Sequence, residues 1–512
     1  MKHFFTLSLL GLFSLGVSAT DFTDNLKVTV NGSSMEQKAV VSVSSDNNVY
    51  TLSLKNFVLS LGGQQMGIGN ITIADLQGEQ RDGYTLLRGK QNIRITAGDD
   101  SSVGMWMGPM LGEVPVDVKA KVTDSTAYAV INITMSALQQ NIQVTFGSGY
   151  QIANSGFEYW HTATISNPYS NNTTTSDEPN TWHSFMSATG SQPWVYMAGY
   201  TPHVFKSNVT RPGSTGKLSA MVTSIQIGDI VANGTITTGR LAAGSIKPSD
   251  ESNHSQLDFS DKATDGNGDP FYVKMYGRPD SLALWVKFIQ GTPNATYPYA
   301  TVSAAITDGT YYQDPQGTTQ YKNVLATAKN AEIASNGAQW QRIVVPFDYI
   351  GVGVDGKALL VTVSTNATAG KGSVDTLYVD DVELIYNTSL KSLSVKGSSV
   401  KDFSAGKQDY EVSVAGKLSA SDIAAVASSS RALVDTQVKD EDGGQVATVT
   451  VTSEDLRTST VYTIHAKSTA TGIHSVKTVN SDGVVYDLQG RRLMGTPAHG
   501  VYIRGGKKFV VK

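Results

Sequence analysis

Polar and apolar residues alternate with a period of two through most of residues 21–150. Leu26-Lys27-Val28-Thr29-Val30 and Val116-Asp117-Val118-Lys119-Ala120 are clear examples, and clusters of turn-forming residues separate such runs. Because successive side chains of a strand point to opposite faces of a sheet, this pattern is typical of half-buried β-strands. About eight such strands fit into the segment, which favours a closed or nearly closed antiparallel barrel.

The rest of the chain has the same all-β character. Residues 388–468 alternate again, as in Tyr410-Glu411-Val412-Ser413-Val414, and glycine is plentiful at 49 of 512 residues. Both features indicate many strands and turns. A net charge of −4 with 16% charged residues gives no electrostatic case for a nucleic acid or an anionic membrane as partner.

The first residues have the parts of a secretory signal peptide. Lys2 and His3 give a short basic start, residues 4–17 are almost wholly apolar or small, and Val17-Ser18-Ala19 fits a cleavage site. We predict a signal peptide over 1–19 and a mature chain that begins at Thr20. An N-terminal membrane anchor is the alternative, although the apolar run is short for a membrane span. No other segment of the sequence predicts a membrane span.

Cysteine is absent from the sequence. For an exported protein this excludes disulfides, thiol nucleophiles and thiolate metal sites, and it excludes a lipoprotein, which needs a cysteine to carry its lipid. A large, cysteine-free exported chain is more typical of a bacterium than of a eukaryote. We expect an extracellular or outer-surface location, with the periplasm as the alternative.

Two short strings enclose the middle of the chain. Asn154-Ser155-Gly156-Phe157-Glu158 opens it, and a strand with a double aspartate, Asp380-Asp381, closes it. If the two strands lie side by side, Glu158, Asp380 and Asp381 form a cluster of carboxylate oxygens suited to a structural calcium ion. In the alternative interpretation Glu158 hydrogen-bonds to the backbone or pairs with a basic residue.

These and other strings resemble known families of exported Bacteroidetes proteins. Leu54-Lys55-Asn56-Phe57 and Gly67-Ile68-Gly69-Asn70-Ile71 resemble the calycin-like (lipocalin-like) domain, which implies a barrel over 20–150. The Asn154 string, Trp182-His183-Ser184-Phe185 and the closing double aspartate resemble a carbohydrate-metabolism domain, a jelly-roll β-sandwich similar to carbohydrate-binding modules, over 151–387. Calycins can hold an apolar ligand, but side chains fill many small barrels.

The C-terminal part carries two weaker resemblances. Residues 388–470 resemble an immunoglobulin-like or cadherin-like spacer sandwich. Residues 471–512, which include Tyr486-Asp487-Leu488-Gln489-Gly490-Arg491, are similar to the C-terminal tails that direct secretion sorting. A plain β-hairpin is the alternative for this short β tail.

Aromatic residues gather just after the opening string. Trp160, Trp182, Trp194 and Tyr196 are the candidate carbohydrate-binding residues, because sugars stack their C–H faces on flat rings. Trp194 follows a turn-forming run and is the better candidate for an exposed ring. Trp160 and Trp182 are expected to be half-buried. Trp285 and Trp340 lie within alternating runs, and we expect both in the core.

Catalytic and metal motifs are not evident in the sequence. The eight histidines are scattered without an H-E-x-x-H motif or a close pair for zinc, and we expect His161 and His183 at the surface. Asp265-Gly266-Asn267-Gly268-Asp269 resembles a calcium-type loop but lacks the glutamate that completes an EF-hand. No carboxylate pair falls in a recognisable glycosidase motif, and no motif implies a redox or nucleotide cofactor.

The sequence therefore predicts a modular, exported, all-β protein that binds a glycan or polysaccharide without catalysis. A polysaccharide-active glycoside hydrolase is the first alternative. A structural or adhesive surface subunit with protein partners and no sugar site is the second.

Overall fold

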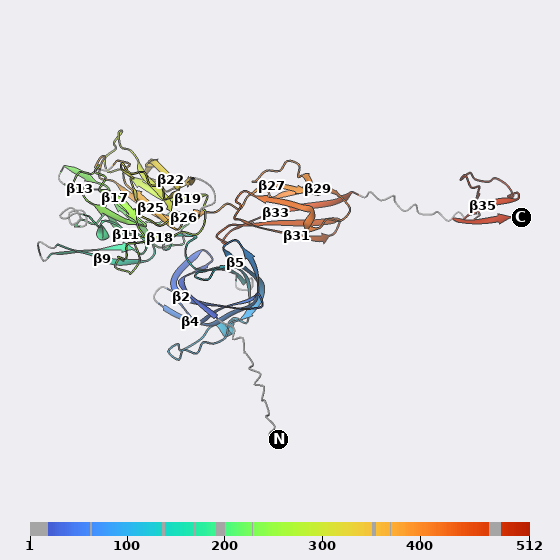
Figure 1. Cartoon of the computed structure of the whole chain (residues 1–512), viewed down its shortest axis with the longest axis horizontal. Coiled ribbons are helices and arrows are strands. Elements are labelled where there is room, and N and C mark those ends of the chain that lie inside the picture. The colour runs from blue at the N-terminus through green and yellow to red at the C-terminus, as the bar shows by residue number, and fades with distance from the viewer. Residues whose placement is uncertain are drawn as a thin grey trace, which may run out of the picture. The chain divides into compact units, whose positions relative to one another are not determined.

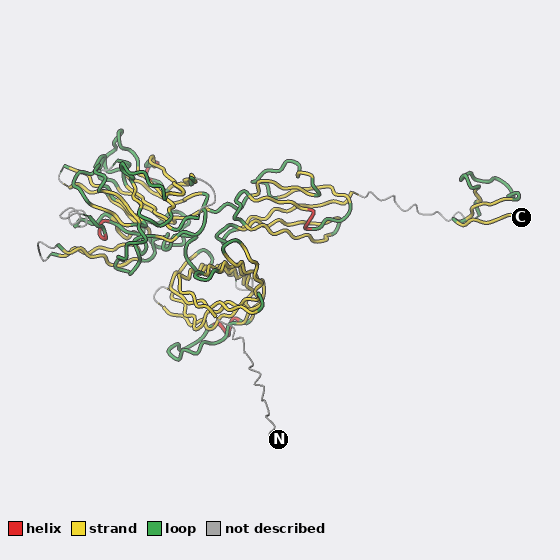
Figure 2. The backbone as a smooth tube through the Cα atoms, in the orientation of Figure 1, coloured by secondary structure: helices red, strands yellow, loops and turns green. Residues whose placement is uncertain are grey.

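The computed structural model describes residues 19–61, 64–135, 139–167, 170, 172–190, 200–227, 229–350, 355–368, 370–469 and 483–512. The regular structure of these residues is β, apart from short 3₁₀ turns (Figure 2): η1 (Gly108–Leu111), η3 (Phe185–Ser187), η4 (Asn336–Ala338) and η5 (Ala420–Asp422). None of their helices has the length and apolar character to span a membrane. The all-β prediction is confirmed, and the predicted signal peptide lies almost wholly outside the described residues.

The N-terminal part is a closed antiparallel barrel (Figure 1). Pairing of the last strand with the first closes it, with Leu26 opposite Phe146 and Val28 opposite Val144. All four of these side chains are buried or half-buried and contribute to the barrel core. The predicted barrel is thus confirmed. Its strands are β1 (Ala19–Val30), β2 (Ser33–Asp46), β3 (Val49–Leu61), β4 (Gln64–Arg81), β5 (Tyr84–Arg94), β6 (Glu113–Val122), β7 (Ala127–Met135) and β8 (Gln140–Phe146).

The middle of the chain is a sandwich of two larger sheets. The first has the strand order β11 (Val204–Ser207), β12 (Ser219–Thr223), β26 (Thr376–Ile385), β19 (Ser281–Ile289) and β23 (Gln341–Pro346). The second has the order β15 (Thr235–Thr237), β25 (Ala358–Ser364), β20 (Ala300–Thr307), β22 (Val324–Ile333) and β24 (Asp348–Tyr349), and β18 (Val273–Lys274) also pairs with β25.

Smaller sheets complete the sandwich. The strands β9 (Trp160–Ser166) and β10 (Thr173–Pro179) form a hairpin, and β13 (Ile225–Ile227) pairs with β14 (Ile230–Ala232). A three-stranded sheet contains β16 (Arg240–Ala243), β17 (Asn253–Leu257) and β21 (Tyr312–Asp314).

Alternation along β19 shows how the two large sheets bury their core. Leu282, Leu284, Val286 and Phe288 are fully buried, whereas Trp285 and Lys287 between them are half-buried. The buried set packs with residues of the second sheet, such as Val302 and Val361, in one hydrophobic cluster. Because side chains alternate across a strand, Trp285 and Lys287 must lie on the outer face of the first sheet.

The C-terminal residues form three further sheets. The first contains β28 (Ser398–Ser399), β27 (Leu390–Val395) and β30 (Ile423–Ala427), and the second β29 (Asp409–Ala415), β33 (Ser459–Thr469), β32 (Gly444–Thr452) and β31 (Leu433–Glu441). Val449, Val451 and Tyr462 are buried here. The last sheet contains β34 (Val485–Tyr486), β35 (Gly500–Arg504) and β36 (Lys507–Val511), within the predicted β tail.

Candidate functional site

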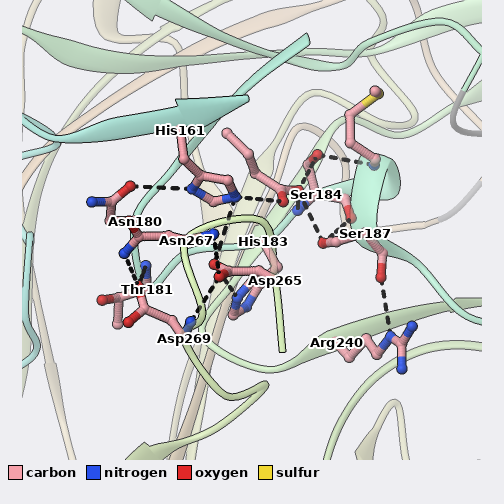
Figure 3. A network of polar contacts seen from close by, with 12 residues as sticks. His161, Asn180, Thr181, His183, Ser184, Ser187, Arg240, Asp265, Asn267 and Asp269 are labelled. Atoms are coloured by element: carbon pink, nitrogen blue, oxygen red, sulfur yellow. Dashed lines mark hydrogen bonds and ion pairs between the residues drawn. The ribbon is translucent and has the colours of Figure 1, made fainter. Parts of the chain in front are cut away.

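Four ionisable side chains meet inside the sandwich, and we call them the imidazole–carboxylate cluster: His161, Glu178, His183 and Asp265. His161 on β9 and Glu178 on β10 are cross-strand partners, with 3.8 Å between the imidazole Nε2 and a carboxylate oxygen. Asp265 Oδ2 lies 3.6 Å from His161 Nε2 and 3.3 Å from His183 Nε2 (Figure 3). None of the four side chains is more than 8% exposed.

The second oxygen of each carboxylate is fixed by hydrogen bonds. Glu178 Oε1 accepts from the backbone N–H of Ser184 at 2.5 Å, from its hydroxyl at 2.6 Å and from the hydroxyl of Ser187 at 3.1 Å. Asp265 Oδ1 accepts from the backbone N–H groups of Asn267 and Asp269 at 2.9 and 2.8 Å. These bonds leave Glu178 Oε2 and Asp265 Oδ2 facing the imidazoles.

The imidazoles of this cluster have protein groups as their polar neighbours. In the described part of the chain, no group of three or more His, Asp or Glu side chains could hold a metal ion. His161 Nδ1 lies 3.1 Å from Asn180 Oδ1 and donates to it, which leaves Nε2 as the ring nitrogen that faces the two carboxylates.

Burial and charge act in opposite directions on the two carboxyl groups. Burial raises the pKa of Glu178, although the nearby His183 and the serine donors oppose the rise. Burial also acts to raise the pKa of Asp265, but His183, the Asp269 amide and the charge of His161 together hold it below its usual value. Asp265 is therefore the ionised partner that the two imidazoles need.

The cluster corrects one expectation from the sequence. The prediction that His161 and His183 are scattered surface residues is wrong, because both converge on Asp265. In the Asp265–Asp269 loop, Asp269 Oδ2 accepts from Asn267 Nδ2 at 2.9 Å and from the Thr181 backbone N–H at 3.1 Å, so protein donors occupy the loop carboxylates (Figure 3). With its side chains buried, the cluster is suited to joining the β9–β10 hairpin to this loop.

The predicted calcium ligands have protein partners of their own. Glu158 accepts hydrogen bonds from the backbone N–H groups of Lys217 and Leu218 at 2.9 and 3.0 Å, which is the alternative that the sequence left open. Asp381 pairs with Arg211 at 2.5 Å, and buried Asp380 accepts the backbone N–H groups of Arg211 and Asp381. Calcium binding by Glu158, Asp380 and Asp381 stays a prediction, and it requires these side chains to move, because no group of three in the described residues could hold a metal ion as placed.

Any calcium binding here must depend on pH. Burial, and then the charge of Asp381, raises the pKa of Asp380 to about 7. Because calcium binds the ionised carboxylate, we expect it to raise the melting temperature of the protein more at pH 8 than at pH 6. Calcium and EGTA titrations followed by differential scanning calorimetry at both pH values, with Asp381→Asn as control, measure this. Equal melting curves with calcium and EGTA at both pH values would exclude the site.

The predicted sugar-binding rings have different environments. Trp182 is completely buried, not half-buried as expected, and packs against Phe157 with ring centroids 5.2 Å apart, so sugar stacking on Trp182 stays a prediction that requires the ring to become exposed. Trp160 is half-buried, its indole N–H donates to the Phe157 carbonyl at 2.6 Å, and Lys206 lies over its ring. Trp194 and Tyr196 lie outside the described residues.

A second group of aromatic residues lies on the outer face of the first sheet, together with one methionine and one lysine. We call this surface the aromatic face: Phe205, Met221, Trp285, Lys287, Trp340 and Tyr378. Register places Phe205, Met221, Tyr378 and Lys287 in one row across β11, β12, β26 and β19. Tyr378 and Trp340 have ring centroids 6.3 Å apart, and the Lys287 ammonium is 5.7 Å from the Tyr378 centroid. All six residues are half-buried.

The aromatic face corrects the expectation that Trp285 and Trp340 belong to the core. Trp285 is opposite Arg342 on β23, and Arg211 lies 5.2 Å above its ring. The sequence contained this signal, because alternate residues of a strand face opposite sides of a sheet. Trp285 falls on the same side as Lys287, and the opposite side of this strand consists of Leu282, Leu284, Val286 and Phe288. Tyr378 has the same relation to Leu377 and Val379, both fully buried.

Comparison with protein families assigns the first part of the chain. Residues 19–148 match the calycin-like beta-barrel domain family, in agreement with the closed barrel of β1–β8. These residues form a calycin-like barrel domain. Among curated proteins, none matches the chain.

Three solved structures resemble the chain at a distance. A "putative glycoside hydrolase" from Bacteroides thetaiotaomicron is 13% identical with a TM-score of 0.31, over 53% of this chain and 87% of that one. A structure of carbohydrate-binding modules from the beta-sandwich superfamily is 10% identical, with a TM-score of 0.20, over 67% of this chain and 96% of that one. The M60 catalytic domain with two CBM51 domains from Clostridium perfringens ZmpB is 10% identical with a TM-score of 0.16, over 96% of this chain and 42% of that one.

Proposed function

We propose that this protein binds a glycan, without catalysis, on the aromatic face of its sandwich. The observation that carries the proposal is the Tyr378–Trp340 pair, whose rings lie 6.3 Å apart on an outward sheet surface. The rings are carried by β26 and by the residue that precedes β23, on either side of β19, and such a pair gives a sugar chain two stacking positions at small cost in side-chain entropy. The predicted signal peptide agrees with a glycan met outside the cell.

Polar groups around the rings suit the hydroxyls of a sugar. Arg211 and Arg342 flank Trp285, and each is held by a carboxylate, Asp381 at 2.5 Å and Glu383 at 3.5 Å. Charged side chains fixed in this way keep free N–H groups or oxygens that can bond to hydroxyls.

Hydrolysis remains the alternative. A glycosidase needs one carboxylic acid that donates a proton and one carboxylate that attacks or activates water. On the aromatic face the carboxylates of Asp381 and Glu383 are each paired with an arginine, Arg211 and Arg342. Hydrolysis would be supported if the protein released reducing ends from a bound polysaccharide. The release should then be lost in Glu383→Gln or Asp381→Asn while binding is retained.

The first test is glycan binding by the full mature chain on a glycan array, followed by titration calorimetry with the best glycan. We expect Tyr378→Ala to weaken binding at least about tenfold, because one stacking contact is worth about 1.4 kcal/mol or more. Tyr378→Phe keeps the ring and should bind nearly as the unchanged protein. Tyr311→Ala, an exposed tyrosine beside β21 in another sheet, is the matched control and should have no effect.

The predicted ring at Trp194 can be tested in the same assay. Binding lost in Trp194→Ala but kept in Tyr378→Ala would move the site to the segment that contains Trp194 and Tyr196. Binding to no glycan at all would overturn the proposal and favour a structural or adhesive subunit, for which capture of a protein partner is the next measurement.

A further inference from the structure

The aromatic face contains a cation whose position suggests the class of glycan. Lys287 lies on β19 between two fully buried residues, Val286 and Phe288, so its side chain must leave the sheet on the outer side. It is opposite Tyr378 in the register, and Trp340 precedes the strand on its other side, whose first residue, Gln341, pairs with Val286. Lys287 therefore occupies the position on β19 between the residues that carry the two rings proposed to stack the sugar.

Lys287 differs from the other cations of this face in its partners. Arg211 and Arg342 are neutralised by Asp381 and Glu383, at 2.5 and 3.5 Å. Within the described residues, the contact that the structure gives the Lys287 ammonium is the face of the Tyr378 ring, 5.7 Å away, and no carboxylate lies within 4.0 Å. The ammonium of the half-buried Lys287 thus lies over the Tyr378 ring, and the described residues provide no counter-ion for it.

This arrangement discriminates between neutral and anionic sugars. A neutral sugar stacked over Tyr378 removes water from the ammonium and replaces it only with hydroxyl dipoles. A sugar with a carboxylate or sulfate group replaces that water with a charge-assisted hydrogen bond, which is about twice as strong as a neutral one. The difference is enlarged by partial burial, because charges interact more strongly away from bulk water.

We propose that the aromatic face selects an anionic polysaccharide, one that carries carboxylate or sulfate groups, and that Lys287 binds the anionic group. This inference rests on the proposed glycan binding and adds the class of ligand to it. Lysine is a compact point charge with three N–H donors, so it can meet a carboxylate or a sulfate ester without a fixed fork geometry. The two sources of the charge are separated by experiment.

The experiment uses the full mature chain and polymers that differ only in charge. Binding is measured to polygalacturonate and to the same polymer after full methyl esterification, and to dextran sulfate beside dextran. We expect at least about tenfold tighter binding to one acidic polymer than to its neutral counterpart. The acidic polymer that binds identifies carboxylate or sulfate as the group recognised.

Variants then assign the charge to Lys287. Lys287→Gln should lower the affinity for the acidic polymer to that for its neutral counterpart. It should also make binding less dependent on salt concentration. Lys287→Arg should keep the preference for the acidic polymer. Lys357→Gln, which removes an exposed lysine beside the second sheet, is the matched control. Melting curves of all variants show whether each is folded.

The outcomes separate this inference from the proposed function. Equal affinity for acidic and neutral polymers, with binding lost in Tyr378→Ala, would overturn the charge selection and leave glycan binding intact. An acidic preference that Lys287→Gln retains would also overturn it. Binding that neither Lys287→Gln nor Tyr378→Ala changes would overturn both proposals for this face.

Discussion

Asp265→Asn should lower the free energy of unfolding of the sandwich by about 3 kcal/mol at pH 7, the cost of removing one partner of a buried ion pair. Asp265 Oδ2 lies 3.3 Å from His183 Nε2 and 3.6 Å from His161 Nε2, so the substitution removes the negative charge that both imidazoles face. Urea unfolding followed by tryptophan fluorescence measures it, because most of the tryptophans are in the 151–387 segment.

Glu178→Gln is the matched control, and we expect it to cost less than about 1 kcal/mol. The amide oxygen can keep the three donors of Glu178 Oε1, from Ser184 and Ser187, and Glu178 Oε2 has no hydrogen-bond partner among the described residues to lose. The same type of substitution at two members of one cluster therefore has unequal effects. Equal losses in the two variants would contradict this account of the cluster.

The pH dependence of the two variants should also have opposite signs. The pKa of Glu178 is raised, so its contribution to stability is fully present below the ordinary glutamate pKa and is lost as pH rises through the raised value. Glu178→Gln should therefore gain relative to the unchanged protein as pH rises from 4 toward neutrality. The pKa of Asp265 is lowered, so its contribution is present above the ordinary aspartate pKa and the deficit of Asp265→Asn should shrink in acid.

Local patterns predicted the strands well because alternation is a property of a single strand. The barrel of β1–β8 follows from runs such as 26–30 and 116–120, each of which carries its own inward and outward parity. The alternation also predicts an outward position for Trp285, but we expected it in the core because tryptophan generally prefers buried positions. The aromatic face was missed because its rows depend on which strands become neighbours, and β26 pairs with β12 and β19 across large sequence distances.

The imidazole–carboxylate cluster could not be predicted for the same reason. His161 and Glu178 are cross-strand partners only in the register of the β9–β10 hairpin, and Asp265 arrives from a loop far along the chain. Nothing in the spacing of the histidines shows this. The pairing of Asp381 with Arg211 was equally invisible, since it depends on how the segment before β12 returns to β26.

Trp182→Ala should lower the free energy of unfolding by about 3–5 kcal/mol, the range found for large aromatic residues removed from a core. The ring is completely buried, contacts Phe157 and belongs to the main cluster of the sandwich. Trp182→Phe should cost much less, because phenylalanine fills most of the volume and removes a buried indole N–H for which the described residues provide no acceptor. Urea unfolding of both variants measures the difference.

Glycan binding by Trp182→Phe decides between a core residue and a binding residue. A core tryptophan that is replaced by a smaller ring leaves the outer face of the first sheet intact, so we expect unchanged affinity, in contrast to Tyr378→Ala. A Trp182→Phe variant that unfolds normally but loses its glycan would show that Trp182 contacts sugar and that the segment around it opens on binding. Since the ring lies on the core side of the sandwich, that result would require the hydrophobic cluster to be exposed, at a cost comparable to that of Trp182→Ala.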